Sequence, residues 1–292
     1  MIRYTVTHIT TYEYAEDVSL GHSEAHLLPR NESHQICHNS RLDIQPRPEA
    51  LWHRQDYFGN RITFFSLQNA HRHLEVKATS EIELYDRGIK ANQDSPAWET
   101  VRELVATGLE GDALSAREMI LDSTYIHRKQ DFADYALLSF TPQRPMLEAC
   151  YDLMNRIYRE FEYDPRFTSV GTPLPEVFRH RRGVCQDFAH FFIAALRSIN
   201  LPARYMSGYI ENEPPPDKKE KLRGADASHA WISVYIPPTG WVEFDPTNNQ
   251  IPSVQHILLA CGRDFQDVSP LRGVIFGGGK HVVHVSVDVR RQ

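Results

Sequence analysis

The sequence contains few cysteines and no long apolar run, and each of these absences excludes a class of protein. Its four cysteines, Cys37, Cys150, Cys185 and Cys261, include no close pair and no CxxC motif. A disulfide framework is therefore not expected, whereas reduced thiols in a reducing compartment are. No stretch approaches the roughly 18 apolar residues of a membrane span, and the first residues lack the apolar core of a signal peptide. The prediction is a cytoplasmic protein.

An excess of positive charge is also absent. Lysine and arginine number 32 against 38 aspartates and glutamates, which leaves a net charge of −6. This balance gives no reason to expect nucleic acid or a membrane as a partner.

Two patterns fall short of a cofactor or metal site. Residues 277–279 are three glycines without the Lys-Ser/Thr of a phosphate loop, which favours a tight turn, and His34, Cys37 and His38 lack zinc-type spacing. We expect no metal and no cofactor.

The chain has the length and the patterning of an α+β protein. With 292 residues, 41% of them hydrophobic, it can bury a substantial core in one or two domains. Residues 1–90 predict an N-terminal antiparallel, β-sandwich-like domain, with a hairpin around turn residues 56–60. Residues 91–140 indicate a helical connection, and residues 141–292 indicate a core of helix and sheet with a C-terminal strand at 281–289. Helices are expected at 97–106, with Ser95 as its cap, and at 115–121, 144–163 and 172–180.

The stretch that organises the core begins at residue 183. After Cys185, apolar residues recur at intervals of three and four, which is the spacing of one buried helix face. Gly183 is poorly suited to a helix interior, so the helix begins near Cys185 and places this thiol in its first turn. Unpaired backbone N–H groups and the helix dipole favour a thiolate there. The buried face is defined by Phe188, Phe191, Phe192, Ala195, Leu196 and Ile199.

A cysteine nucleophile needs a base, and the base needs a group that orients it. His229 opens one strand-like run, and Asp245 closes the next, with a turn between them. If the two runs pair antiparallel, the start of the first lies opposite the end of the second. Adjacent strands are about 4.8 Å apart, which permits a hydrogen bond between His229 and Asp245. The start of the helix can then bring Cys185 to them as the third member of a catalytic triad.

Three motifs resemble those of the transglutaminase-like superfamily, a papain-related group that uses a Cys, His, Asp triad in this order. They are GVCQDFAH at 183–190, SHAWISVYI at 228–236 and GWVEFDPTN at 240–248. The N-terminal β-region and the tail through residue 279 resemble a bacterial subgroup of transglutaminase-like cysteine peptidases. The resemblance implies a papain-like core, in which the helix that carries the cysteine packs on an antiparallel sheet.

The resemblance also implies a role for each residue of the triad. Cys185 is the nucleophile, His229 is the base and later the acid, and Asp245 holds the imidazole. The expected reaction is cleavage of a peptide or isopeptide bond in a peptide or protein substrate, through a thioester. The backbone N–H of Cys185 is the first oxyanion donor. The second donor is open, because Arg179 stands near the place where papain-type enzymes carry a glutamine, and Tyr163 is one candidate.

Other residues near the motifs have weaker assignments. Tyr163 and Trp231 are candidates for contact with the substrate, although Trp231, two positions after His229, is equally suited to the core. Asp187 and His190 turn away from the buried helix face, so we expect structural roles for them. The segment at 211–226 is rich in proline and charge and precedes His229, which favours a lid over the site.

Two other functions remain open. One is acyl transfer to an amine or deamidation of glutamine, which is transglutaminase activity, and incorporation of an amine would distinguish it from hydrolysis. The other is an inactive peptide-binding module. The intact set of Cys185, His229 and Asp245 argues against this module, and an unreactive thiol would favour it. Calcium is not implied, since no Asp-rich calcium loop is present in the sequence.

Overall fold

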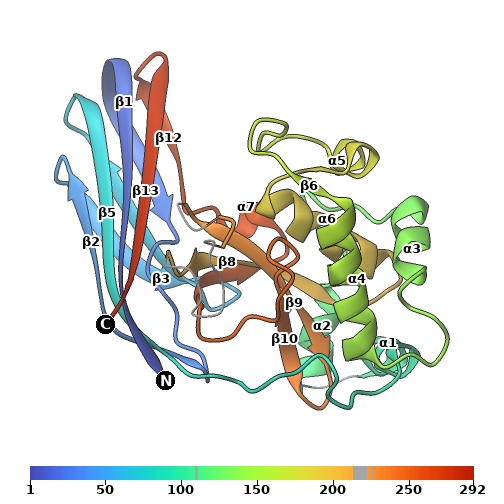
Figure 1. Cartoon of the computed structure of the whole chain (residues 1–292). Coiled ribbons are helices and arrows are strands. Elements are labelled where there is room, and N and C mark those ends of the chain that lie inside the picture. Colours follow the sequence, from blue (N-terminus) through green and yellow to red (C-terminus); the bar gives the residue numbers. More distant parts are fainter. Residues whose placement is uncertain (109–110, 213–221, 225–226) are drawn as a thin grey trace.

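A large antiparallel sheet forms one side of the molecule (Figure 1). The computed structural model describes residues 1–108, 111–212, 222–224 and 227–292. Five strands of the large sheet run in the order β2-β5-β1-β4-β3, and two more, β12 and β13, pair with β1. The bounds of these strands are β1 Ile2–Ala25, β2 Gln35–Gln45, β3 Ala50–Gln55, β4 Arg61–Leu67, β5 His71–Leu84, β12 Leu271–Gly277 and β13 His281–Arg291.

Strand β1 holds this sheet together because it is 24 residues long. Its first half pairs with β5 on one side and β13 on the other, and its last residues pair with β4 and β12. Every second side chain is buried from Tyr4 to Thr10, as expected of a strand with one covered face. The predicted hairpin is present as β3 and β4, and Gly59 in its turn has a φ of 77°.

The last two strands differ from the domain division that the sequence suggests. Sequence analysis assigns residues 141–292 to one core, but β12 and β13 pair with β1 in the large sheet. Gly277, Gly278 and Gly279 have φ values of 92°, 83° and 60° and join the two strands, so they form the expected turn. The N-terminal unit therefore contains residues from both ends of the chain, whose termini lie close together (Figure 1).

A second sheet, of four strands in the order β10-β9-β8-β11, lies between the large sheet and most of the helices (Figure 1). Helix α6 (Cys185–Ser198) packs against β8 and β9 on one side and against α3 and α5 on the other. All of its side chains from Asp187 to Arg197 are buried, which makes it the central helix. The remaining elements are α1 Trp98–Thr107, α2 Gly111–Glu118, α3 Gln130–Leu137, α4 Met146–Glu160, β6 Glu162–Tyr163, α5 Leu174–His180, β7 Arg182–Gly183, β8 Ala203–Ile210, β9 His229–Ile236, β10 Gly240–Phe244, β11 His256–Gly262 and α7 Phe265–Val268.

The helices follow the sequence-based expectation except at three places. Helix α2 covers residues 111–118, whereas the sequence predicts a helix at 115–121. Helix α3 is not expected from the sequence. Ser95, expected to cap α1, instead accepts the backbone N–H of Leu147 at 2.9 Å, and α1 begins after Ala97 without a side-chain cap. Ser95 thus links the starts of α1 and α4, which are close only in the folded chain.

Side-chain amides from the N-terminal region complete the outer edge of β11. Gln35 donates to the carbonyl of Leu258 and accepts its N–H, both at 2.7 Å. Asn60 makes the same pair of bonds with Cys261, at 2.7 and 2.9 Å. Each amide supplies the donor and the acceptor that a neighbouring strand would supply. The edge of the small sheet is therefore closed by the large-sheet unit.

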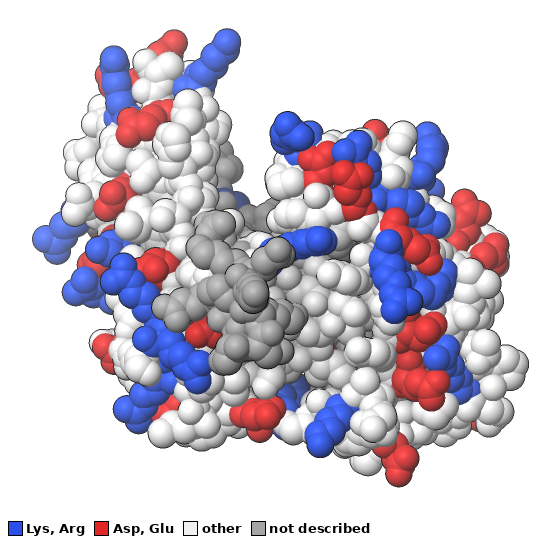
Figure 2. Space-filling model, in the orientation of Figure 1, with Lys and Arg blue, Asp and Glu red and all other residues white. Residues whose placement is uncertain are grey.

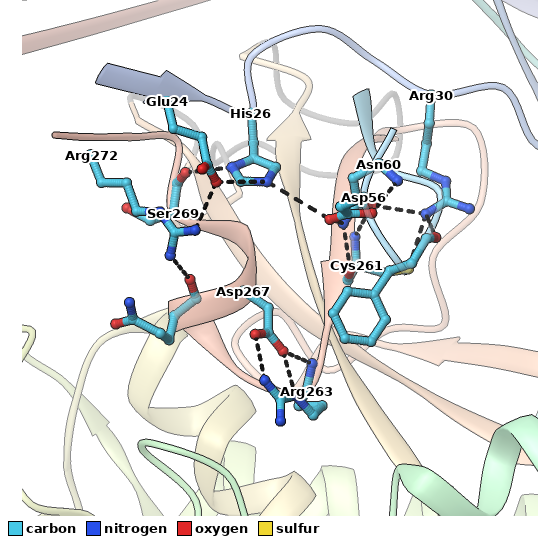
Figure 3. A network of polar contacts seen from close by, with 12 residues as sticks. Glu24, His26, Arg30, Asp56, Asn60, Cys261, Arg263, Asp267, Ser269 and Arg272 are labelled. Atoms are coloured by element: carbon cyan, nitrogen blue, oxygen red, sulfur yellow. Dashed lines mark hydrogen bonds and ion pairs between the residues drawn. The ribbon is translucent and has the colours of Figure 1, made fainter. Parts of the chain in front are cut away.

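A polar network lies beside this junction, between the end of β1 and the segment that carries α7 and the start of β12 (Figure 3). Glu24 forms an ion pair with Arg272 at 2.7 Å. His26 Nδ1 lies 3.0 Å from the carbonyl oxygen of Ser269, to which it donates. These contacts tie the two units together at a second point.

The surface in Figure 2 shows a notch between the large sheet and the helical side, with charges of both signs interspersed. Among the described residues on this face, the charges form no extended patch of a single sign. Within the described part of the chain, no helix has the length and apolarity needed to cross a membrane.

Candidate active site

Cys185 is the first residue of α6, as expected. The turn before it is fixed by Asp187, whose Oδ2 accepts the backbone N–H of Val184 at 2.8 Å and the hydroxyl of Thr168 at 2.6 Å. Gly183 packs against this carboxylate, because a Cβ at this position would come within 2.6 Å of Asp187 Oδ2. Asp187 therefore has the structural role that the sequence indicates. Cys185 itself is only 9% exposed.

His229 and Asp245 meet at one end of the small sheet. Strands β9 and β10 pair antiparallel, and His229 starts the first while Asp245 follows the second. His229 Nε2 lies 2.8 Å from Asp245 Oδ2, and both side chains are fully buried. The structure thus brings together the pair that strand pairing predicts.

Asp245 accepts more hydrogen bonds than the sequence suggests. Its Oδ1 accepts the backbone N–H groups of Thr247 and Asn248 at 2.9 and 3.2 Å. Its Oδ2 accepts the Asn248 side-chain amide at 2.8 Å and His256 Nε2 at 3.0 Å, in addition to His229. Burial alone would raise the pKa of Asp245, but His229 and His256 outweigh it and hold this pKa well below its usual range. The carboxylate is ionised throughout the physiological range.

His229 is poised to be an imidazolium. Burial alone would lower its pKa, but the Asp245 carboxylate and the side chain of Cys185 outweigh burial and raise the pKa of His229 from 6.5 to about 10. Because Nε2 is bonded to Asp245, Nδ1 is the ring nitrogen available to the thiol. Nδ1 is buried and has no formed hydrogen bond with the described residues. A catalytic contact is often long before the substrate binds.

Gly224 covers the same nitrogen. A Cβ at this position would lie 2.6 Å from His229 Nδ1, and the residue has a φ of 87°, so both space and backbone favour glycine. The neighbouring Arg223 is held by Asn248, whose amide bonds to its backbone N–H at 2.9 Å and to its carbonyl at 3.2 Å. Residues 213–221 and 225–226, the greater part of the expected lid, lie outside the described residues.

The two residues proposed to contact the substrate lie in different settings. Trp231 has no exposed surface, stacks on His229 with ring centroids 6.0 Å apart, and donates its indole N–H to Glu243 at 2.7 Å. It therefore shields the His229–Asp245 pair from water in this conformation. Tyr163 is half-buried beside Phe188 of α6, and its contact with substrate stays a prediction.

Three residues at this site are not found by sequence reasoning: Asn248, His256 and Gly224. Nothing in the local pattern separates His256 from the other fourteen of the fifteen histidines, because its role depends on a contact between the two edge strands of the sheet. His256, His229 and Asp245 are the described residues whose ligand atoms gather closely enough to hold a metal, within 4.8 Å of one another. Their hydrogen bonds already account for this spacing.

The other cysteines lie in surroundings unlike that of Cys185. Cys150 is fully buried in the helical core, and burial raises the pKa of its thiol. Cys261 is buried next to Arg30, which donates to its sulfur at 3.1 Å, and Cys37 is partly exposed. Cys185 thus stands apart as the thiol beside a histidine–carboxylate pair.

Two sequence profiles match the chain. The profile of the transglutaminase-like superfamily covers residues 136–246, and that of the bacterial transglutaminase-like N-terminal region covers residues 4–83. A Mycobacterium tuberculosis protein, described as uncharacterised, is 38% identical over 295 residues, which span 98% of this chain and 92% of the relative. A protein-glutamine gamma-glutamyltransferase of Pseudomonas aeruginosa is 33% identical over 76 residues, which span 26% of this chain and 11% of that enzyme.

The fold is similar to the crystal structure of a candidate cysteine protease from Cytophaga hutchinsonii. The TM-score is 0.76, the alignment covers 99% of this chain and 90% of the other, and the sequence identity is 21%. At this identity the similarity concerns the fold alone. It confirms the α+β architecture, with a large antiparallel sheet beside a core of helices and a smaller sheet.

Proposed function

The chain belongs to the transglutaminase-like superfamily, and we propose that it cleaves an amide bond in a peptide or protein through a thioester on Cys185. Membership of this family supports a cysteine-dependent activity in general. The observation that carries the proposal is the buried His229–Asp245 hydrogen bond of 2.8 Å beside Cys185, because it holds the imidazole with Nδ1 free for the thiol proton.

In the first half of the reaction, the Cys185 thiolate attacks the carbonyl carbon of the substrate. The developing oxyanion is stabilised by the backbone N–H of Cys185, in the first turn of α6. The His229 imidazolium then gives its Nδ1 proton to the leaving amine, the C–N bond breaks, and a thioester remains. Asp245 keeps Nε2 protonated throughout, since it accepts that proton in a fixed hydrogen bond.

In the second half, neutral His229 takes a proton from water, which attacks the thioester. The C–S bond breaks, the acid is released, and Cys185 returns to the thiolate beside the imidazolium. The second oxyanion donor in this scheme is unassigned, and Tyr163, next to the turn at Gly183, is the residue to test.

A second candidate is transfer of the acyl group to an amine, and one observation favours it. Cys185 is 9% exposed and His229 1%, and exclusion of water is what lets an amine compete for a thioester. Deamidation of glutamine belongs to the same alternative. The products distinguish these reactions from cleavage of a peptide bond.

The test has two stages. The first follows iodoacetamide labelling of each cysteine against pH by mass spectrometry, in wild type and in His229→Ala. We expect Cys185 to label well below pH 8, and His229→Ala to remove that advantage over Cys37. Equal labelling of Cys185 and Cys37 in wild type would contradict the proposal and favour an inactive binding module.

The second stage measures products from peptides and proteins that contain glutamine, with and without a fluorescent primary amine. Free amino termini without incorporation of the amine indicate hydrolysis. Incorporation indicates acyl transfer, and ammonia alone indicates deamidation. Cys185→Ala should abolish every product, whereas Cys37→Ala, a matched change at a distant thiol, should abolish none.

A further inference from the structure

We propose that His256 is a positioning residue that acts through Asp245, by sharing the carboxylate oxygen that orients His229. His256 Nε2 lies 3.0 Å from Asp245 Oδ2, and His229 Nε2 lies 2.8 Å from the same oxygen. This inference rests on the proposed function, because it concerns the same triad. It adds a fourth residue that none of the three motifs contains.

Because of the position of His256 in the fold, its contact with Asp245 connects the two opposite edges of the small sheet. The strand order is β10-β9-β8-β11, so Asp245, after β10, and His256, at the start of β11, belong to opposite edges. On β8, between the two histidine-bearing strands, Gly208 pairs with His229. A Cβ on Gly208 would come within 2.7 Å of the Trp231 ring, so glycine leaves room for the indole between the histidines.

The hydrogen bonding of His256 is directed at Asp245 alone. The side chain is 1% exposed, and its Nδ1 is buried without a partner among the described residues. An ionised carboxylate accepts only from an N–H, so Nε2 carries the proton. Nδ1 makes no hydrogen bond of its own, so the Nε2–H bond to Asp245 is the polar contact that this ring makes among the described residues. An apolar side chain would avoid the unpaired nitrogen, so the donated bond is the feature that a histidine adds here.

The ring is also held in place by its neighbours. The Trp231 ring meets it edge-on, with centroids 5.2 Å apart, and the His229 ring lies at 6.0 Å. Other titratable groups near these rings pair among themselves: Glu211 with Tyr4, and Glu243 with Trp231, Arg87 and His34. Asp245 is therefore the group through which His256 influences the site.

Sharing one oxygen has a predictable effect on His229. A second N–H donor on Oδ2 withdraws part of the negative charge that would otherwise stabilise the His229 imidazolium. His256 thus limits how basic His229 becomes, while it keeps Oδ2 directed at the ring. An imidazolium that is too stable is a poor acid for the leaving amine, so this limit assists the first half of the reaction.

The test needs no substrate. In the full-length protein, the ring nitrogens of His229 and His256 are observed by ¹⁵N NMR between pH 5 and 11. In wild type, His256 is expected to carry a proton on Nε2 that is hydrogen-bonded to Asp245. A ring that carries its proton on Nδ1 and none on Nε2 would overturn the proposal, and this arm requires no variant.

The second arm compares His256→Gln with His256→Met, two side chains of similar length of which only glutamine has an N–H donor. Loss of a hydrogen bond to a charged group should raise the titration point of His229 by about one pH unit in His256→Met. His256→Gln should restore most of it. Equal titration of His229 in both variants and in wild type would overturn the proposal.

A control separates this outcome from a general effect of changing a buried histidine. His8 is also 1% exposed, but its ring bonds to Tyr209 and Thr10 and makes no hydrogen bond to Asp245. His8→Gln should leave the titration of His229 unchanged. If wild-type His229 shows no raised titration at all, the proposed function fails, which is a different result from failure of the His256 pair.

Discussion

The end of the small sheet that carries His229 and Asp245 and the polar junction beside it both contain a buried histidine near carboxylates, but in different arrangements. His229 and His26 are both buried, at 1% and 2% exposed, and both lie near carboxylates. His229 is 2.8 Å from Asp245, whereas His26 Nε2 is 3.8 Å from Glu24 and 3.9 Å from Asp56. The pKa of His229 is raised to about 10, while that of His26 is lowered.

The difference follows from whether a carboxylate is in hydrogen-bond contact with the histidine. Asp245 accepts the Nε2–H of His229 in a direct hydrogen bond, so its negative charge stabilises the charged ring. At the junction, Glu24 is occupied by Arg272 at 2.7 Å and Asp56 by Asn60 at 2.7 Å (Figure 3). Burial is then the largest influence on His26, and the Arg272 charge adds to it. Proximity to a carboxylate is thus insufficient to charge a buried histidine, because the two must be in contact.

The largest effect is expected from Asp245→Asn, which removes the carboxylate that contacts His229. The carboxylate charge disappears and the amide favours the wrong tautomer of His229, so turnover should fall by about 10³- to 10⁴-fold. Labelling of Cys185 at pH 6 should fall to the level of Cys37. Glu24→Gln, the matched change at the junction, should leave both measurements unchanged. A folded Asp245→Asn protein with wild-type turnover would contradict the assignment of Asp245.

The second prediction concerns stability at alkaline pH. The folded-state pKa of His229 is raised above 6.5, so its contribution to stability is fully present below pH 6.5 and is lost as the pH rises through about 10. The loss should approach roughly 4 kcal/mol. Urea denaturation at pH 7 and pH 10 measures it, and His229→Gln should be less sensitive to this change of pH. An equal loss in the two proteins would assign the effect to other groups.

Buried neutral histidines should produce the opposite effect in acid. Burial lowers the pKa of His8 to about 4, and burial with the nearby Arg197 charge lowers that of His190 to about 3. Below pH 6.5 the unfolded chain binds protons that the folded chain does not, so stability falls as the pH decreases. Each histidine should cost about 2 to 3 kcal/mol by pH 4.5. Urea denaturation of wild type and His8→Gln at pH 7 and pH 4.5 tests this, since the variant should lose less.

The smallest effect is expected at the junction itself. Arg272→Met removes a positive charge that lowers the pKa of His26 and frees Glu24, so the titration of His26 should move up by about one pH unit. Histidine NMR measures the shift. Arg263→Met, which breaks the separate pair with Asp267, is the matched control and should leave His26 unchanged. A downward shift in Arg272→Met would show that the arginine acts through packing.

Sequence reasoning predicts the positions of the candidate residues correctly where the signal is local. Cys185 is found from the apolar spacing that follows it and the glycine before it, and His229 and Asp245 are found from two strand-like runs joined by a short turn. Antiparallel pairing then brings these two residues together without further information. The family resemblance adds roles to residues that the patterns had already placed.

The remaining features depend on contacts between distant parts of the chain. His256 reaches Asp245 across the sheet, and Ser95 bonds to Leu147, and neither contact has a signature in the local sequence. The same holds for β12 and β13, whose partner is the first strand. The alternation of apolar and polar residues predicts that these segments are strands, but it does not indicate which strand each of them pairs with.

The pairing of β1 with β13 has a consequence for the order of synthesis. Residues 2–14 leave the ribosome before the helical core, yet part of their sheet is supplied by residues 281–291, which leave after it. One side of β1 therefore stays unpaired while the whole helical core is made. An unpaired strand is a template for wrong partners, so the period of greatest exposure to misassembly lasts until the final strand arrives.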